Sequence, residues 1–151
     1  MNVKTITGTL VLLALASNLG TAGAACLDPK TFMSGYKVPL DSEVGTAEAI
    51  VIGRVLSEQG LKEDPADPNG YTAYNVTIRV LARLKGSLSN VIVIRNENTS
   101  SRYPMSVGEE HILFVSRDGR ELWVDSCGNS AAMPGGEELV KQIQAHMRKQ
   151  K

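Results

Sequence analysis

The most regular alternation of apolar and polar residues in this chain lies in YTAYNVTIRVLARLKG, residues 71–86. Apolar side chains recur at every second position, with polar or charged side chains between them. This period of two residues is typical of a β-strand that buries one face. The buried face is expected to carry Tyr74, Val76, Ile78, Val80, Ala82 and Leu84.

Three further segments extend the prediction to five strands. EAIVIGRVLS, residues 48–57, is rich in β-branched residues and contains Gly53, which indicates a bend or bulge within a strand. NVIVIRN, residues 90–96, follows a short polar link and predicts another strand. EEHILFVSRDGRELWVDSC, residues 109–127, predicts a hairpin that turns at the Asp-Gly pair 118–119.

The remaining segments predict two connections and a helix. EQGLKEDPADPNG, residues 58–70, is polar, contains two prolines and predicts a long loop that turns at its final Asn-Gly pair. Residues 97–108 show no period and predict an irregular connection. Residues 131–151 are assigned to a carboxy-terminal helix after a Pro-Gly-Gly break, because apolar residues recur at helical spacing and acidic residues precede basic ones. The apolar residues of this helix are Leu139, Val140, Ile143 and Met147.

Five strands in this order predict an all-β fold, a small closed barrel with a carboxy-terminal α-helix. The third and fourth strands are joined by a long connection and the fourth and fifth by a tight turn. Closing the sheet removes the exposed strand edges that promote aggregation. The barrel domain is expected to span residues 26–130, with residues 131–151 packed on it or trailing from it.

Residues 1–25 have the pattern of a secretory signal peptide. One lysine precedes a short apolar stretch, which ends in the small residues Ala-Gly-Ala-Ala. The apolar stretch is shorter than the roughly 20 residues needed to span a bilayer. Cleavage is expected near Ala24 or Ala25, leaving a secreted or periplasmic protein with no transmembrane segment.

The balance of charge excludes binding of nucleic acid through bulk charge. The chain has 16 basic and 16 acidic side chains, for a formal net charge of zero. Nucleic-acid-binding domains carry a basic surface that neutralises phosphates. The aromatic residues Tyr71, Tyr74, Tyr103 and Trp123 would form a platform for glycans only if the fold brings them together.

The two cysteines, Cys26 and Cys127, predict a disulfide, because an exported chain folds in oxidising surroundings. Closing a loop of about 100 residues stabilises a fold by roughly 4.7 kcal/mol in the chain-entropy description. A second role for Cys26 is that of a lipid anchor. Lipid attachment would require a large aliphatic residue three positions earlier, where Gly23 stands, and would leave Cys127 as an unpaired thiol.

No arrangement of residues indicates catalysis, a metal site or a cofactor. His111 and His146 are the only histidines, and they do not form the His-Glu-x-x-His spacing of helical zinc sites. No serine stands in a Gly-x-Ser-x-Gly elbow. We therefore expect structural roles for both histidines and a protein that is not an enzyme.

Four short segments carry a resemblance to a known family: IVIGRV at 50–55, RLKG at 83–86, VGEEHILF at 107–114 and LWVDSC at 122–127. Together they resemble the oligonucleotide/oligosaccharide-binding (OB) barrel of the tissue inhibitors of metalloproteinases and of related netrin-like modules. Small exported bacterial proteins with the same pattern resemble the chain more closely still. The resemblance covers roughly residues 26–130 and implies a five-stranded OB-like barrel.

In these inhibitors the mature chain begins with a cysteine whose α-amino group and carbonyl chelate the zinc of the target protease. The resemblance therefore gives Cys26 a third role, provided that cleavage follows Ala25. The inhibitors, however, begin Cys-x-Cys, whereas Leu27 and Asp28 follow Cys26 here, and residues 97–108 contain no cysteine. The pair Cys26 and Cys127 thus resembles the family's second bridge, which leaves the chelating residue without a counterpart.

These observations predict an exported small binding protein that acts by protein–protein interaction. A metalloproteinase is the partner that the resemblance implies. The alternative is a structural or adaptor module of the cell envelope without inhibitory activity. Loops on a stable scaffold often carry recognition, so the expected binding surfaces are Cys26–Tyr36, Glu58–Gly70 and Glu97–Gly108.

Overall fold

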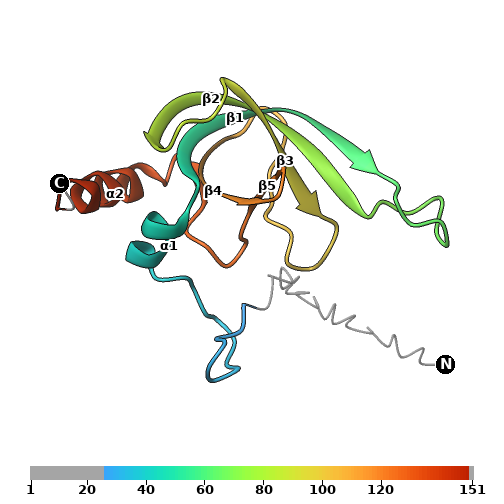
Figure 1. Cartoon of the computed structure of the whole chain (residues 1–151), viewed down its shortest axis with the longest axis horizontal. Helices are drawn as coiled ribbons and strands as arrows, with labels where there is room; N and C mark the ends of the chain where they lie inside the picture. The colour runs from blue at the N-terminus through green and yellow to red at the C-terminus, as the bar shows by residue number, and fades with distance from the viewer. Residues whose placement is uncertain (1–25, 150–151) are drawn as a thin grey trace, which may run out of the picture.

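The computed structural model describes residues 26–149 and is mostly β-sheet with a helix at its carboxy-terminal end (Figure 1). The predominance of β-strands and the carboxy-terminal helix were both predicted. The predicted signal peptide, residues 1–25, lies outside the described residues. Within residues 26–149, no helix is both long enough and apolar enough to cross a membrane. The elements are α1 (Leu40–Thr46), β1 (Ala49–Leu61), β2 (Ala73–Lys85), β3 (Val91–Glu97), β4 (Glu110–Asp118), β5 (Glu121–Val124), β6 (Ala131–Met133) and α2 (Glu137–Lys149).

The first five strands are linked into a ring by their hydrogen-bonded pairing. The strand order is β1-β2-β3-β5-β4, and β4 also pairs with β1. Four of these five contacts are antiparallel, and β3 with β5 is the parallel one. It is also the shortest, because Ile94 and Leu122 are its single registered pair. Strand β6 pairs with the start of β4 outside the ring.

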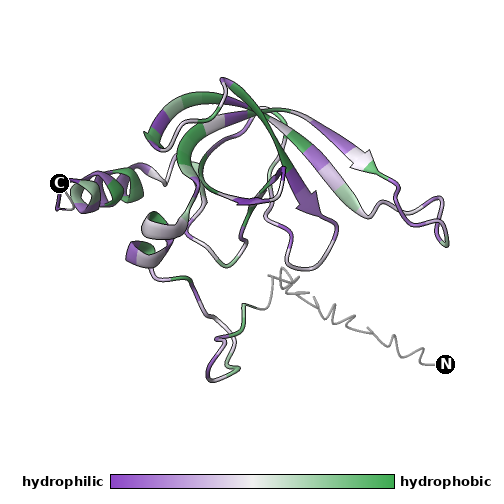
Figure 2. Cartoon of the chain, viewed as in Figure 1, coloured by the Kyte–Doolittle hydropathy of each residue, from purple (hydrophilic) through white to green (hydrophobic). Residues whose placement is uncertain are grey.

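The inside of the ring is filled by alternate residues of its strands, as the period of two predicts. Val76 and Ile78 of β2 are fully buried and lie in one apolar cluster with Leu113 and Val115 of β4. Apolar and polar residues alternate along the β1–β2 ribbons (Figure 2). Leu84 departs from the predicted face and packs against a second cluster instead.

The second cluster lies between the helices and the outer face of the ring. Ile112 and Phe114 of β4 point outward and are buried there with Ile143 of α2 and Val44 of α1. Strand β4 is therefore buried on both faces. Burying one such side chain contributes roughly 1.5–3 kcal/mol, so α2 is an integral part of the fold. The predicted helix is confirmed, although it begins at Glu137 and residues 131–133 form strand β6.

Two details of the sequence prediction are confirmed. The register of β1 against β2 shifts between Ile52 and Gly53, which is the predicted bulge. A Cβ at Gly53 would lie 2.4 Å from Cγ2 of Ile78, so the close approach of β2 requires a glycine here. Gly119 has a φ of 55°, as the predicted Asp-Gly turn requires.

Two other details were wrong. Residues 58–61 were assigned to a loop, but they belong to β1, because the β1–β2 ladder continues to the pair Leu61 and Ala73. The two strands thus project beyond the ring as a long arm, opposite α2 (Figure 1). Helix α1 was not predicted at all. Its last carbonyl groups are capped from a distance by Lys85, whose Nζ donates to the carbonyl oxygens of Val44 (2.7 Å), Gly45 (2.8 Å) and Ala47 (2.7 Å).

Candidate binding surfaces

The predicted disulfide between Cys26 and Cys127 is present, with a Cα–Cα distance of 5.5 Å. It joins the beginning of the described chain to the turn that follows β5. The first predicted surface, Cys26–Tyr36, is thereby fixed to the ring at one end. At its other end, the amide of Val38 donates to the carbonyl oxygen of Cys127 (3.0 Å).

Residues 26–36, here called the amino-terminal loop, form a compact turn. Oδ1 of Asp28 accepts hydrogen bonds from the amides of Lys30 (2.7 Å) and Thr31 (3.0 Å). The amide of Asp28 donates to the carbonyl oxygen of Met33 (2.9 Å), and that of Tyr36 donates to the carbonyl oxygen of Cys26 (3.0 Å). These bonds satisfy the backbone locally, so the loop keeps its shape without a core of its own.

The amino-terminal loop displays apolar side chains to solvent. Phe32 is 76% exposed and Met33 is 71% exposed. Phe32 also has a φ of 56°, in the left-handed region that bulky residues seldom adopt. Such backbone strain is found most often at functional sites. The sequence marked this loop as a surface but gave no sign of which side chains it exposes.

The second and third predicted surfaces lie side by side. Arg102 of the 97–108 connection forms an ion pair with Glu58 of β1, and its guanidinium carbon lies 4.1 Å from the centre of the Tyr74 ring. Nδ2 of Asn98 donates to the carbonyl oxygen of Tyr71 (2.9 Å). The connection is therefore laid along the β1–β2 arm.

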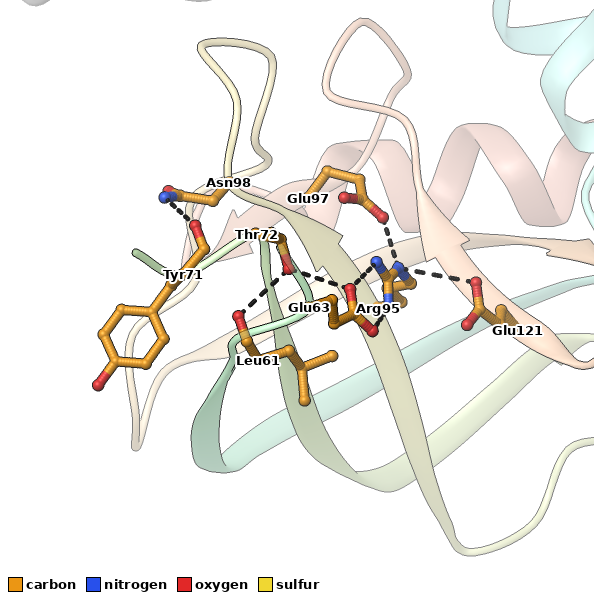
Figure 3. Close-up of polar contacts among 8 residues, drawn as sticks. All are labelled: Leu61, Glu63, Tyr71, Thr72, Arg95, Glu97, Asn98 and Glu121. Carbon is orange, nitrogen blue, oxygen red and sulfur yellow. Dashed lines mark hydrogen bonds and ion pairs between the residues drawn. The ribbon is translucent and has the colours of Figure 1, made fainter. Parts of the chain in front are cut away.

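Arg95 of β3 ties the arm to the ring (Figure 3). It donates two hydrogen bonds to Glu63 in the β1–β2 loop (3.0 and 2.6 Å), contacts Glu97, and lies 3.7 Å from Oε2 of Glu121 on β5. Hydrogen bonds from Arg95 and Thr72 lower the pKa of Glu63 to about 2. The three acidic partners hold the Arg95 side chain in place.

A groove with a volume of about 470 Å³ opens between β3 and β5. We call it the β3–β5 groove. The two strands pair at Ile94 and Leu122, and no further registered pair follows. Cys127 of the disulfide is among its lining residues. The side chains that line it include Arg95, Glu97, Arg102, Asp118, Glu121, Trp123, Asp125 and Cys127.

The β3–β5 groove combines one large aromatic side chain with an excess of acidic groups. Trp123 is the only tryptophan of the chain and is 40% exposed. The lining has two guanidinium groups against the carboxylates of Glu97, Asp118, Glu121 and Asp125. The pattern of residues did not predict this groove. Its one signal was the alternation of Leu122, Trp123 and Val124, which places Trp123 on the outer face.

The two histidines occupy different environments. His111 is 2% exposed; its Nδ1 lies 3.1 Å from the hydroxyl of Tyr103 and its Nε2 lies 3.3 Å from Oε2 of Glu109. His146 lies on α2, with Nδ1 2.8 Å from Oδ1 of Asp41 on α1. Each histidine thus links two segments of the fold. In the described part of the chain, no group of three or more His, Cys, Asp or Glu residues could hold a metal ion.

The four-residue aromatic platform is not formed. Tyr103 is buried in the ring against His111. Tyr71 and Tyr74 lie together on the arm, with ring centres 5.7 Å apart, whereas Trp123 lines the β3–β5 groove. The fold therefore separates these side chains into three environments.

Comparison with models of known protein families and with curated proteins finds no match to this chain.

Proposed function

We propose that this chain is an exported binding protein that acts by protein–protein interaction on an OB-like closed-barrel scaffold. The ring order of the strands supports the OB-like scaffold. The pattern of residues 1–25 and the disulfide support export, because disulfides persist in oxidising compartments.

The observation that carries this proposal is the exposure of Phe32 and Met33 on a stapled loop. Covering apolar surface gains roughly 25 cal/mol per Å². A loop that is already ordered by its own hydrogen bonds loses little conformational entropy on binding. The amino-terminal loop is thus suited to insert its two apolar side chains into a pocket of a partner protein.

A metalloproteinase is one partner that this arrangement could serve. Cys26 stands at the base of the amino-terminal loop, beside the exposed Leu27. Zinc chelation in the manner of the tissue inhibitors requires the free α-amino group of Cys26, which exists only if cleavage follows Ala25. The intact mass of the mature protein distinguishes these termini, and a chain that begins at Ala25 would rule out this form of inhibition.

Affinity capture from the native cell-envelope and secreted fractions tests the proposal itself. The bait is the disulfide-bonded protein, compared with the double variant Phe32→Ser and Met33→Ser. Leu81→Ser is the matched control, because Leu81 is 46% exposed but lies on β2. We expect the control to recover the same partner as the wild type and the double variant to lose it.

Two other outcomes are informative. Recovery of envelope assembly components without a protease would favour the adaptor function over the inhibitor. Equal recovery by the wild type and the double variant would contradict the assignment of the amino-terminal loop as the contact surface.

A further inference from the structure

Strand β3 forms one wall of the β3–β5 groove. Some of its backbone N–H and C=O groups point away from β2 and can pair with another strand. At the two ends of the β2–β3 ladder, the amide of Val80 donates to the carbonyl oxygen of Asn90 and the amide of Asn98 donates to that of Thr72 (both 2.9 Å). Hydrogen-bonded pairs alternate along an antiparallel ladder. Counting inward from these ends, the backbone groups of Arg95 and Glu97 point away from β2 and toward β5. The carbonyl oxygen of Glu97 already accepts the amide of Thr99 (2.9 Å), and the parallel pair of Ile94 and Leu122 uses the amide of Arg95. The carbonyl oxygen of Arg95 and the amide of Glu97 remain for pairing.

The opposite wall, β5, has no registered pair with Arg95 or Glu97. Strand β5 pairs with β3 at Ile94 and Leu122, and ends at Val124. Beyond that pair no further residues of β3 and β5 are in register, and both strands contribute residues to the lining of the groove. A strand edge of this kind can pair with an extended segment of another chain.

The side chains that line the groove favour a basic ligand. Arg95 is already paired with Glu63, Glu97 and Glu121, and Arg102 is paired with Glu58. Asp118 and Asp125 remain as further negative charges of the lining. Oδ1 of Asp125 accepts the amide hydrogen bond of Cys127 (2.8 Å), which holds its carboxylate at the edge of the groove.

Trp123 adds an aromatic surface to this acidic lining. Its ring is partly open to solvent within the groove. Arginine and lysine side chains bind over the face of a tryptophan, which is the best of the aromatic residues for this contact. Neighbouring carboxylates would strengthen such a contact with a cation and repel an acidic ligand.

We infer that the β3–β5 groove binds an extended polypeptide segment that carries an arginine or lysine side chain. The backbone of the segment pairs with the carbonyl oxygen of Arg95 and the amide of Glu97 on β3, and its basic side chain lies on Trp123 beside Asp118 and Asp125. This inference rests on the proposed protein–protein interaction and gives it a second contact surface, separate from the amino-terminal loop.

The single tryptophan makes the test direct, because the intrinsic fluorescence of the protein reports on the groove. The probes are two blocked pentapeptides, Val-Thr-Arg-Val-Thr and Val-Thr-Glu-Val-Thr, added to the disulfide-bonded protein. We expect the arginine peptide to change the emission of Trp123 saturably and to bind at least about tenfold more tightly than the glutamate peptide. Added salt should reduce this difference, since exposed charges are screened.

Two variants locate the site by calorimetry. Asp118→Asn is expected to weaken binding of the arginine peptide. Glu138→Gln serves as its matched control, because Glu138 lies exposed on α2. Trp123→Ala is expected to abolish binding while the circular dichroism spectrum and the disulfide are retained. Equal affinity for both peptides, no saturable binding of the arginine peptide, or full binding by Trp123→Ala would overturn the inference.

A neutral oligosaccharide is the remaining probe. Saturable binding of chitotetraose without binding of the arginine peptide would also overturn the inference, because it would assign the groove to glycans. Failure here is distinguishable from failure of the proposed function. Affinity capture depends on Phe32 and Met33, and it can succeed whether or not the groove binds a peptide.

Discussion

The hydroxyl group of Tyr103 lies 3.1 Å from Nδ1 of His111 inside the ring of strands. Tyr103 belongs to the 97–108 connection, and its carbonyl oxygen accepts a hydrogen bond from Nδ2 of Asn96 (2.8 Å). Burial, and secondarily the charge of Glu109, raise the pKa of the Tyr103 hydroxyl. An irregular connection is thus anchored in the core by a polar pair, which explains how a segment without periodicity has a fixed position beside the groove.

Replacing Tyr103 with phenylalanine should destabilise the fold by about 1–3 kcal/mol, because Nδ1 of the buried His111 loses its hydrogen-bond partner. Urea unfolding followed by circular dichroism measures this change. Tyr71→Phe is the matched control, since Tyr71 is 47% exposed, and it should change the free energy of unfolding by less than about 0.5 kcal/mol. Equal effects of the two substitutions would show that the hydroxyl of Tyr103 contributes no stability.

Alanine substitution should have opposite effects at two glycines. At Gly53 the new Cβ would lie 2.4 Å from Cγ2 of Ile78 and 3.3 Å from the carbonyl oxygen of Arg79, which predicts a loss of about 1–3 kcal/mol. At Gly45 in α1 nothing lies within 4 Å of the new Cβ. Alanine there should stabilise the helix by about 0.5–1 kcal/mol. Thermal unfolding of the two variants under the same conditions gives the comparison, and a neutral Gly53→Ala would contradict the close packing of β1 on β2.

The carboxyl group of Glu43 should make the protein less stable as pH rises. Burial raises its pKa, and the opposing effect of hydrogen bonds from the amide and side chain of Asn129 (2.7 Å each) is smaller. The folded state therefore binds the proton more tightly than the unfolded state. The resulting stability is present below the unfolded pKa of 4.5 and is lost as pH rises through the higher folded pKa.

Glu43→Gln removes this titration and keeps an acceptor for Asn129. The free energy of unfolding of the wild type, relative to that of this variant, should fall as pH rises above 4.5. Urea unfolding at intervals of one pH unit measures the difference, with Glu138→Gln as the exposed control. Parallel pH profiles for the wild type and Glu43→Gln would contradict a raised pKa.

Glu63 should have the opposite dependence on pH. Its pKa is lowered to about 2 by hydrogen bonds from Arg95 and Thr72, against an ordinary value of 4.5. Its contribution to stability is therefore present above pH 4.5 and is lost as pH falls toward 2. Carbon-detected NMR titration of the Glu63 carboxyl should give a midpoint near 2, and Arg95→Met should move that midpoint toward 4.5. An unchanged midpoint in Arg95→Met would show that Arg95 is not the cause.

Local patterns predicted the regular parts of this fold because the physics there is local. The alternation in β2, the bulge at Gly53, the turn at Gly119 and the apolar spacing of α2 each depend on residues close in sequence. The disulfide was predictable for a different reason, since the chain has two cysteines and one pairing.

The features that sequence analysis missed depend on distant partners. Helix α1 has seven residues and is capped by Lys85, about 40 residues away along the chain. Strand β6 has three residues and exists because β4 offers it an edge. The β3–β5 groove lies between two strands that share a single registered pair. The residues that line it could be identified only once the positions of the two strands were known.

The disulfide belongs to both proposed contact surfaces at once. Cys26 begins the amino-terminal loop, Cys127 lines the β3–β5 groove, and the bond spans 101 positions of the chain. A partner that contacts both surfaces would gain avidity from their fixed spacing, because the second contact forms within an existing complex. Reduction of one bond would release that spacing. The protein would then lose more affinity for this partner than it would from disrupting either surface alone. Both contacts would thus depend on one covalent bond.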